Sequence, residues 1–166
     1  MGIICCTRFN NSTYNENILW KRINNYEGCI YNTPVKIKEN IPLNIHIFVL
    51  EMNNDLNIIL GIGCIQNHIY IDLKHKYSKN NCVKIYKENN YNRYTYKNNY
   101  RIDRSELNRE ELEYIKILDI LLFKGKTHFK RGSGIQRISS WITDNKVFDF
   151  YKYINNLFIK KYNISF

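Results

Sequence analysis

The sequence predicts an α+β domain in which a small curved sheet or β-barrel is flanked by helices. Three observations lead to this fold class. Runs with the apolar character of strands dominate the chain up to residue 102. Segments with apolar residues at helical spacing lie on either side, at residues 12–25 and after residue 108. With 166 residues, two prolines and no clear linker or internal repeat, the chain fits a single domain, residues 1–166.

Four stretches up to residue 65 have the composition of strands. IICCTRF (residues 3–9) is apolar enough to enter the core, and GCIYNTPVKI (residues 28–37) predicts a strand that ends near Pro34. Ile45–Met52 and Ile58–Ile65 are almost wholly apolar, and the NNDLN sequence between them is typical of a hairpin turn. Because apolar strands of this kind invite aggregation at a sheet edge, we expect the pair at the centre of the sheet.

The first expected helix covers Ser12–Asn25. Its apolar residues Ile18, Leu19 and Ile23 recur on one face. Asn24-Asn25 is suited to end the helix.

The region between residues 83 and 102 alternates apolar or aromatic residues with polar ones, as half-exposed strands do. Val83–Tyr86 and Tyr91–Ile102 are the two expected strands. In the second, tyrosines alternate with cations: Tyr91, Tyr94, Tyr96 and Tyr100 with Arg93, Lys97, Arg101 and Arg104. Two interpretations remain open. Either the strand presents stackable rings beside phosphate-binding cations, or it belongs to an amphipathic hairpin whose tyrosines pack inward.

Two further helices are expected in the C-terminal part of the chain. Asn108 is suited to be the N-cap of the first, Glu111 completes a capping box, and the helix ends at Lys124-Gly125. The last helix is expected to begin around Thr143 or Asp144. Its apolar residues recur at helical spacing: Val147, Phe150, Tyr151, Ile154, Leu157 and Phe158.

The net charge of +10 makes polyanions the expected partners, with nucleic acid first. The chain is rich in Ile, Asn, Lys and Tyr and contains no alanine, a bias typical of an AT-rich genome. The clustering of the cations is therefore better evidence than their total. No apolar run approaches membrane-spanning length, so we expect no membrane partner.

The five cysteines predict reduced thiols rather than disulfides or a metal site. They are Cys5, Cys6, Cys29, Cys64 and Cys82, an odd number without a CxxC pair. We expect an intracellular protein, in the cytoplasm or nucleus, with no cofactor and no bound metal. Gly2 followed by two cysteines is reminiscent of dual acylation, but a first strand is the favoured interpretation, because Cys6 stands where the myristoylation pattern requires Ser or Thr.

The densest run of one charge is KGKTHFKRGSGIQRI, residues 124–138, hereafter the basic segment. Lys124 suits a helix C-terminus, but the remaining cations have no such structural reason. Gly132-Ser133-Gly134 is suited to direct backbone N–H groups at one phosphate. The predicted nucleic-acid-binding residues are Lys126, His128, Lys130, Arg131, Ser133 and Arg137, with Arg93 and Arg101 from the tyrosine-rich strand. A solvated connection between two helices is the alternative interpretation.

The case for catalysis is weaker, and whether the chain is an enzyme stays open. Asp72-Leu73-Lys74 has the D-x-K ending of some metal-dependent nucleases, with Asp55 or Glu51 as the candidate second carboxylate. A solvated loop at the end of a strand is the favoured interpretation. The glycines of the G61-I-G63 sequence indicate close packing or a bulge in a strand, because no third glycine and no helix follow. We assign no catalytic residue.

The order of elements over about residues 5–66 resembles that of PUA-like domains, especially the YTH and EVE branches. CTRFNNSTYNENILWKRINNYEGCIYNTP and IHIFVLEMNNDLNIILGIGCI carry the resemblance: a strand, a short helix, a cysteine-containing strand with a Thr-Pro turn, an F-V-L strand, a polar hairpin and a G-I-G strand. The resemblance implies a small β-barrel that binds nucleic acid, often around a flipped or modified base. The composition also resembles that of proteins from large DNA viruses, which implies nothing about activity.

The resemblance also implies a base pocket. Tyr14 and Asn17 stand where YTH domains place hydrogen-bonding pocket residues, and the Cys29–Tyr31 stretch stands where they place a cage tryptophan. Tyr31 and Trp141 are the aromatic walls that this chain offers instead. The expected function is nucleic-acid binding, RNA before DNA. The alternatives are a nucleoside- or nucleic-acid-processing hydrolase, ASCH-like or metal-dependent, and a basic host-interaction module.

Overall fold

The computed structural model describes residues 2–73, 82–144 and 146–164, and it confirms an α+β fold. The strands are β1 (Ile3–Phe9), β2 (Cys29–Thr33), β3 (Ile47–Asn53), β4 (Ile58–Ile65), β5 (Tyr94–Asn98), β6 (Tyr100–Asp103) and β7 (Gln136–Arg137). The α-helices are α1 (Asn11–Ile23), α2 (Arg109–Phe123), α3 (Ser140–Thr143) and α4 (Phe150–Tyr162). Short 3-10 helices, η2 (Asn89–Tyr91) and η3 (Arg104–Glu106), flank β5 and β6.

Five strands form one mixed sheet in the order β6-β4-β3-β1-β7. β1 and β3 are parallel, and the β3–β4 hairpin lies within the sheet, which confirms the prediction for this apolar pair. β2 and β5 form a separate antiparallel ladder. Among the described residues the strands do not close into a barrel, so the barrel form of the prediction is not realised here.

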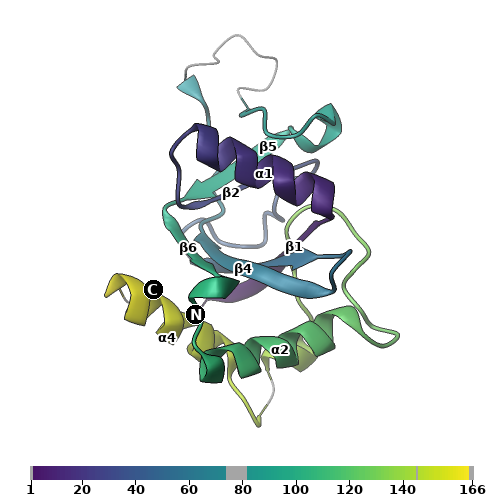
Figure 1. Cartoon of the computed structure of the whole chain (residues 1–166), viewed down its shortest axis with the longest axis vertical. Helices are drawn as coiled ribbons and strands as arrows, with labels where there is room; N and C mark the ends of the chain where they lie inside the picture. Colours follow the sequence, from purple (N-terminus) through teal and green to yellow (C-terminus); the bar gives the residue numbers. More distant parts are fainter. Residues whose placement is uncertain (1, 74–81, 145, 165–166) are drawn as a thin grey trace.

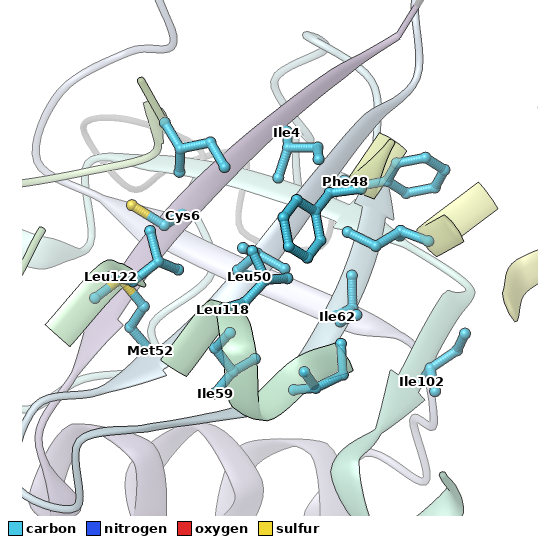
Figure 2. Close-up of a cluster of buried hydrophobic side chains, with 14 of the residues drawn as sticks. Ile4, Cys6, Phe48, Leu50, Met52, Ile59, Ile62, Ile102, Leu118 and Leu122 are labelled. Carbon is cyan, nitrogen blue, oxygen red and sulfur yellow. The ribbon is translucent and has the colours of Figure 1, made fainter. Parts of the chain in front are cut away.

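Helices α2, α3 and α4 cover one face of the sheet, and α1 with the β2–β5 ladder covers the other (Figure 1). The alternation of side chains along β1 and β3 supplies both cores. Ile4, Cys6, Phe48 and Leu50 face α2 and α4, and they share one core with Ile62 of β4 and with Leu118 of α2 (Figure 2). The neighbouring residues Ile3, Cys5, Ile47 and Val49 face the α1 side. The central strands are therefore buried on both faces.

The first helix is confirmed as α1, and part of its polar surface is buried. Leu19 is 53% exposed and Ile23 is 70% exposed, whereas Asn17 and Lys21 are buried. Nδ2 of Asn17 donates to the carbonyl of Ile30 and to the Tyr86 hydroxyl, so this buried amide has partners.

Two other segments differ from the predicted secondary structure. The last helix begins at Phe150 with Asp149 as its N-cap, so the predicted start near Thr143 is wrong, and Val147 is exposed. Val83–Tyr86 has no strand pairing in the described structure, and η2 precedes β5 where one long strand was expected. In contrast, α2 begins as predicted, with the Asn108–Glu111 capping box in place.

The first strand is confirmed, and its thiols are inaccessible. Cys5 and Cys6 are fully buried in β1. Burial raises the pKa of the Cys5 thiol to about 12 and that of the Cys6 thiol to about 11. Cys29 and Cys64 are likewise buried in strands, β2 and β4. In the described part of the chain, no helix is long and apolar enough to cross a membrane.

Candidate nucleic-acid interface

A cleft of about 250 Å³ lies where β1 and β3 end, between the first turn of α1 and the basic segment. The chain that follows α2 passes beside the sheet to reach this place (Figure 1). The cleft is lined by Thr7, Arg8, Phe9, Asn10, Thr13, Asn32, Pro34, Asn54, Tyr86, Tyr91, Lys130, Gly132, Ser133 and Gly134. None of these described lining residues is acidic. Ligands of open sheets commonly bind beyond the carboxyl ends of parallel strands, which is where this cleft lies.

Arg8, near the end of β1, is a half-buried cation that lines the cleft. Its Nε donates to the carbonyl of Phe129, and its Nη2 donates to Oε1 of Gln136 over 2.8 Å. Its Nη1 is buried and has no hydrogen-bond partner within the described structure. Two of the three nitrogens thus fix the guanidinium against the basic segment, and the third has no acceptor among the described residues.

Asn54, directly after β3, also holds the basic segment. Its backbone N–H donates to the carbonyl of Phe9 over 2.8 Å, and its Nδ2 donates to the carbonyl of Lys130 over 2.9 Å. Its Oδ1 is buried and unpartnered among the described residues. Of the three buried side-chain atoms without a partner in the described residues, two therefore belong to residues that line the cleft, Arg8 and Asn54.

Two glycines give the basic segment its path along the cleft. Gly132 has a φ of 120° and Gly134 a φ of 72°, values in the region that favours glycine. A Cβ at Gly134 would also lie 2.8 Å from Cγ2 of Val35. Ser133, between them, is exposed and lines the cleft. These glycines are therefore required by backbone conformation and close packing.

The first turn of α1 borders the cleft but already has its acceptors. The Asn10 side chain accepts from the Thr13 N–H at 2.8 Å, and Oδ2 of Asp55 accepts from the Asn11 N–H at 2.8 Å. The helix N-terminus is thus satisfied within the protein. A ligand in the cleft would depend on Arg8 and the basic segment instead.

Two tyrosines form the aromatic wall of the cleft. Tyr86 is buried, and its hydroxyl accepts from Nδ2 of Asn17 at 3.3 Å. Tyr91 is 43% exposed and meets Tyr86 edge to face, with ring centroids 6.1 Å apart. Tyr91 can therefore offer a ring face to a base while Tyr86 supports it from the core.

The structure gathers part of the predicted cation set around the cleft. Lys130 and Ser133 line it, and Arg131 lies exposed between them. The Lys130 ammonium donates to Oδ1 of Asn57 over 2.7 Å, and Nδ1 of His128 accepts from the Lys130 N–H at 3.3 Å.

The other predicted cations lie farther from the centre of the cleft. Lys126 is exposed near the end of α2. Arg137, in β7, lines a second hollow of about 450 Å³ together with Lys38. Arg93 is exposed two residues after Tyr91, and its Nη2 donates to Asn90.

Arg101 is not available to a phosphate, so the structure corrects its predicted role. It is 6% exposed, and its guanidinium binds Glu51, itself 3% exposed, through Nε and Nη2, with a shortest distance of 2.7 Å. Nη1 donates to Asp103 over 2.9 Å. Burial opposes the charge of Arg101, but the Glu51 carboxylate outweighs it and raises the pKa of the guanidinium. The tyrosine-rich strand thus matches the inward-packing alternative here, with Tyr96 also buried.

The four predicted base-pocket residues do not surround a common hollow. Tyr31 is buried in β2 and donates to Oε1 of Glu51 over 2.8 Å. The Tyr14 hydroxyl accepts from Arg101 at 3.3 Å, and Nδ2 of Asn17 donates to the carbonyl of Ile30 over 2.8 Å. Trp141 is 50% exposed in α3, which packs on the other face of the sheet. The proposed cage of Tyr31 and Trp141 is therefore not assembled.

The glycines of the GIG sequence make room for these buried polar groups. A Cβ at Gly61 would lie 2.6 Å from Nη2 of Arg101 and 2.7 Å from Oε2 of Glu51. A Cβ at Gly63 would lie 2.1 Å from the Tyr31 hydroxyl. The register between β3 and β4 also shifts between Leu50 and Met52, opposite Gly61. Close packing and a bulge, as predicted, explain both glycines.

The nuclease alternative gains no support from the described residues. Lys74 of the D-x-K sequence lies outside them. Glu51 is paired with Arg101, and Asp55 accepts from the first turn of α1. The described chain contains no group of three or more His, Cys, Asp or Glu side chains that could hold a metal ion.

Comparison with protein-family models, with curated proteins and with solved structures finds no match to this chain. The cleft therefore has to be judged from its own residues. Two of its main groups, Arg8 and Asn54, were missed by the sequence prediction. A single charge inside the apolar IICCTRF strand was the available signal for Arg8. Asn54 had no comparable signal because it is one of many asparagines in turns.

Proposed function

We propose that this chain binds single-stranded nucleic acid, with RNA preferred over DNA, along the cleft and the basic segment. The observation that carries this proposal is the Arg8 guanidinium, which belongs to a cleft-lining residue and has one buried nitrogen without a partner in the described structure. Lys130 lines the same cleft, and none of its described lining residues is acidic. Phosphates neutralised by such cations release counterions, which drives binding of a polyanion. Tyr91 adds a ring on which a base can stack.

This proposal keeps the class of ligand implied by the PUA-like resemblance and changes the place where it binds. The resemblance put a base between Tyr31 and Trp141, but Tyr31 is buried and Trp141 lies on the opposite face of the sheet. A single-stranded nucleic acid that lies along the basic segment would pass from the cleft toward Arg137, which lines the second hollow. The hydrolase and host-interaction alternatives have no observation in the described residues that favours them.

The test is the salt dependence of binding to a single-stranded oligonucleotide. If the protein contacts about four phosphates, the log–log slope of affinity against salt should be near −3, since each phosphate contributes roughly 0.7. Replacing Lys130 and Arg131 together by Glu should flatten the slope by more than about one unit and weaken all sequences alike. Fluorescence anisotropy at several salt concentrations measures both quantities.

A matched control separates a local effect from a change in net charge. Lys146 and Lys152 are exposed near the start of α4, on the other side of the sheet. Their double replacement by Glu changes the net charge by the same amount and should leave the slope nearly unchanged. Equal slopes in the wild type and the Lys130→Glu, Arg131→Glu variant would contradict the proposal and make the basic segment a connector.

A further inference from the structure

We propose that the cleft distinguishes RNA from DNA at one nucleotide, through Asn54, which accepts a hydrogen bond from a ribose 2′-hydroxyl while Arg8 binds the adjacent phosphate. This inference rests on the proposed function and assigns its sugar selectivity to a particular atom. The starting point is the pair of unpartnered atoms in residues that line the cleft. Arg8 lacks an acceptor for Nη1, and Asn54 lacks a donor for Oδ1.

Such atoms call for a ligand because burial without a partner is costly. An unsatisfied buried polar group loses its hydration without compensation, and the loss is larger for a charged group. One missing acceptor and one missing donor define the complementary ligand. It must offer an anionic oxygen to Arg8 and an O–H or N–H to Asn54.

The two side chains are held close to each other. Nε of Arg8 binds the carbonyl of Phe129, and Nδ2 of Asn54 binds the carbonyl of the next residue, Lys130. The Asn54 N–H also binds the carbonyl of Phe9, which follows Arg8 in the chain. The unpartnered atoms therefore belong to side chains anchored one residue apart on two different segments.

A ribonucleotide presents the required pair of groups on neighbouring atoms. The 2′-hydroxyl and the 3′-phosphate are attached to adjacent carbons of the ribose, so one nucleotide offers a donor and an anionic acceptor side by side. The 2′-hydroxyl is also the group that distinguishes RNA from DNA at a given site. Deoxyribose has no such donor and leaves Oδ1 of Asn54 unsatisfied.

The neighbouring residues are consistent with a nucleotide in this orientation. Lys130 and Ser133 line the same cleft and can share the phosphate with Arg8. Asn32 also lines the cleft, but its amide is already used: Nδ2 donates to Asn92 over 2.8 Å, and Oδ1 accepts from Thr95 at 2.7 Å. Asn54 is therefore the better candidate to recognise the sugar.

The experiment varies the ligand before it varies the protein. One sequence is prepared as RNA, as deoxyuridine-containing DNA and as 2′-fluoro RNA, and the affinity of the full chain for each is measured by fluorescence anisotropy. The 2′-fluoro strand keeps an RNA-like sugar shape but has no donor. We expect RNA to bind about 3- to 10-fold more tightly than either of the others, the range for one hydrogen bond.

Two variants then locate the effect. Asn54→Ala should bring the affinity for RNA close to that for DNA. Arg8→Met should weaken both by about 10-fold or more, since it removes a charged hydrogen bond. Arg22→Met is the matched control, because Arg22 is exposed in the last turn of α1. Thermal melting checks that each variant is folded.

The outcomes separate this inference from the proposed function. If RNA and 2′-fluoro RNA bind equally well, the protein binds nucleic acid but does not recognise the hydroxyl as donor, and the inference is wrong. If RNA, DNA and 2′-fluoro RNA all fail to bind, the proposed function itself is wrong. Discrimination that persists in a folded Asn54→Ala protein would assign it to another residue.

Discussion

Arg101 and Arg8 differ in how completely their guanidinium groups are paired, and this difference separates a structural role from a binding role. Arg101 is buried with the Glu51 carboxylate, Asp103 and the Tyr14 hydroxyl around it. Arg8 is only partly buried, yet one of its nitrogens has no partner in the described structure. A fully paired cation has a structural role, whereas an incompletely paired one beside a cleft is suited to bind a ligand.

The two residues of the buried Glu51–Arg101 pair should depend on each other for their effect on stability. Removing one partner leaves a buried charge without compensation, so Glu51→Leu or Arg101→Met should each lower the free energy of unfolding by about 3–5 kcal/mol. The Glu51→Leu, Arg101→Met double variant should lose clearly less than the sum, because neither charge remains. Urea unfolding of the four proteins measures the coupling. Strictly additive losses would show that the two residues do not depend on each other.

Helix α1 shows how a polar face can be the buried one. Asn17 and Lys21 are buried. Lys21 lies near the Glu51–Arg101 pair, and Asn17 donates to both the Ile30 carbonyl of β2 and the Tyr86 hydroxyl. Burial, and then the nearby charge of Arg101, lower the pKa of the Lys21 ammonium. The buried face of α1 thus contributes hydrogen bonds, beside the packing of Tyr14 and Trp20 against the core.

A comparison of two substitutions on α1 tests this. Asn17→Ala removes the donor to the Ile30 carbonyl, and we expect it to cost about 1–3 kcal/mol of stability. Leu19→Gln changes an exposed side chain to another good helix former and should stay within about 0.5 kcal/mol. Chemical denaturation of both variants gives the two values. The opposite order would show that Leu19 matters more for stability than the hydrogen bonds of Asn17.

The whole molecule depends on strands that serve two cores. β3 sends Phe48 and Leu50 to the α2 side and Ile47 and Val49 to the α1 side. Neither the α2 side nor the α1 side can therefore keep its core if the central sheet is lost. The two tryptophans lie on opposite sides of this sheet, with Trp20 packed against the α1-side core and Trp141 in α3.

This arrangement predicts a single cooperative unfolding transition. In variants that retain one tryptophan each, the fluorescence of Trp20 and of Trp141 should change at the same denaturant concentration. Ile62→Asp and Val49→Asp place an unpaired carboxylate in opposite cores, and each should abolish folding in both layers. A soluble Ile62→Asp protein that melts cooperatively would refute the central position of this hairpin.

Local sequence signals predicted much of the secondary structure. The apolar runs placed β1, β3 and β4, because a continuous apolar strand needs cover on both faces. The Asn108–Glu111 box fixed the start of α2, since capping involves residues only three positions apart. The basic segment was also visible in the sequence, and it supplies Lys130 and Ser133 to the cleft.

Only the tertiary structure decided which charges are available to a ligand. Arg101 and Arg8 are both single arginines in strands, but Glu51 lies beside the first, and no partner reaches Nη1 of the second in the described structure. The cleft joins the end of β1, the turn after β3 and a loop more than a hundred positions away from Arg8 along the chain. Periodicity and capping act over a few residues, whereas these contacts depend on how the two layers pack on the shared sheet. For that reason the sequence by itself determined the strands, the capped helix and the excess of positive charge, and the packing determined the site.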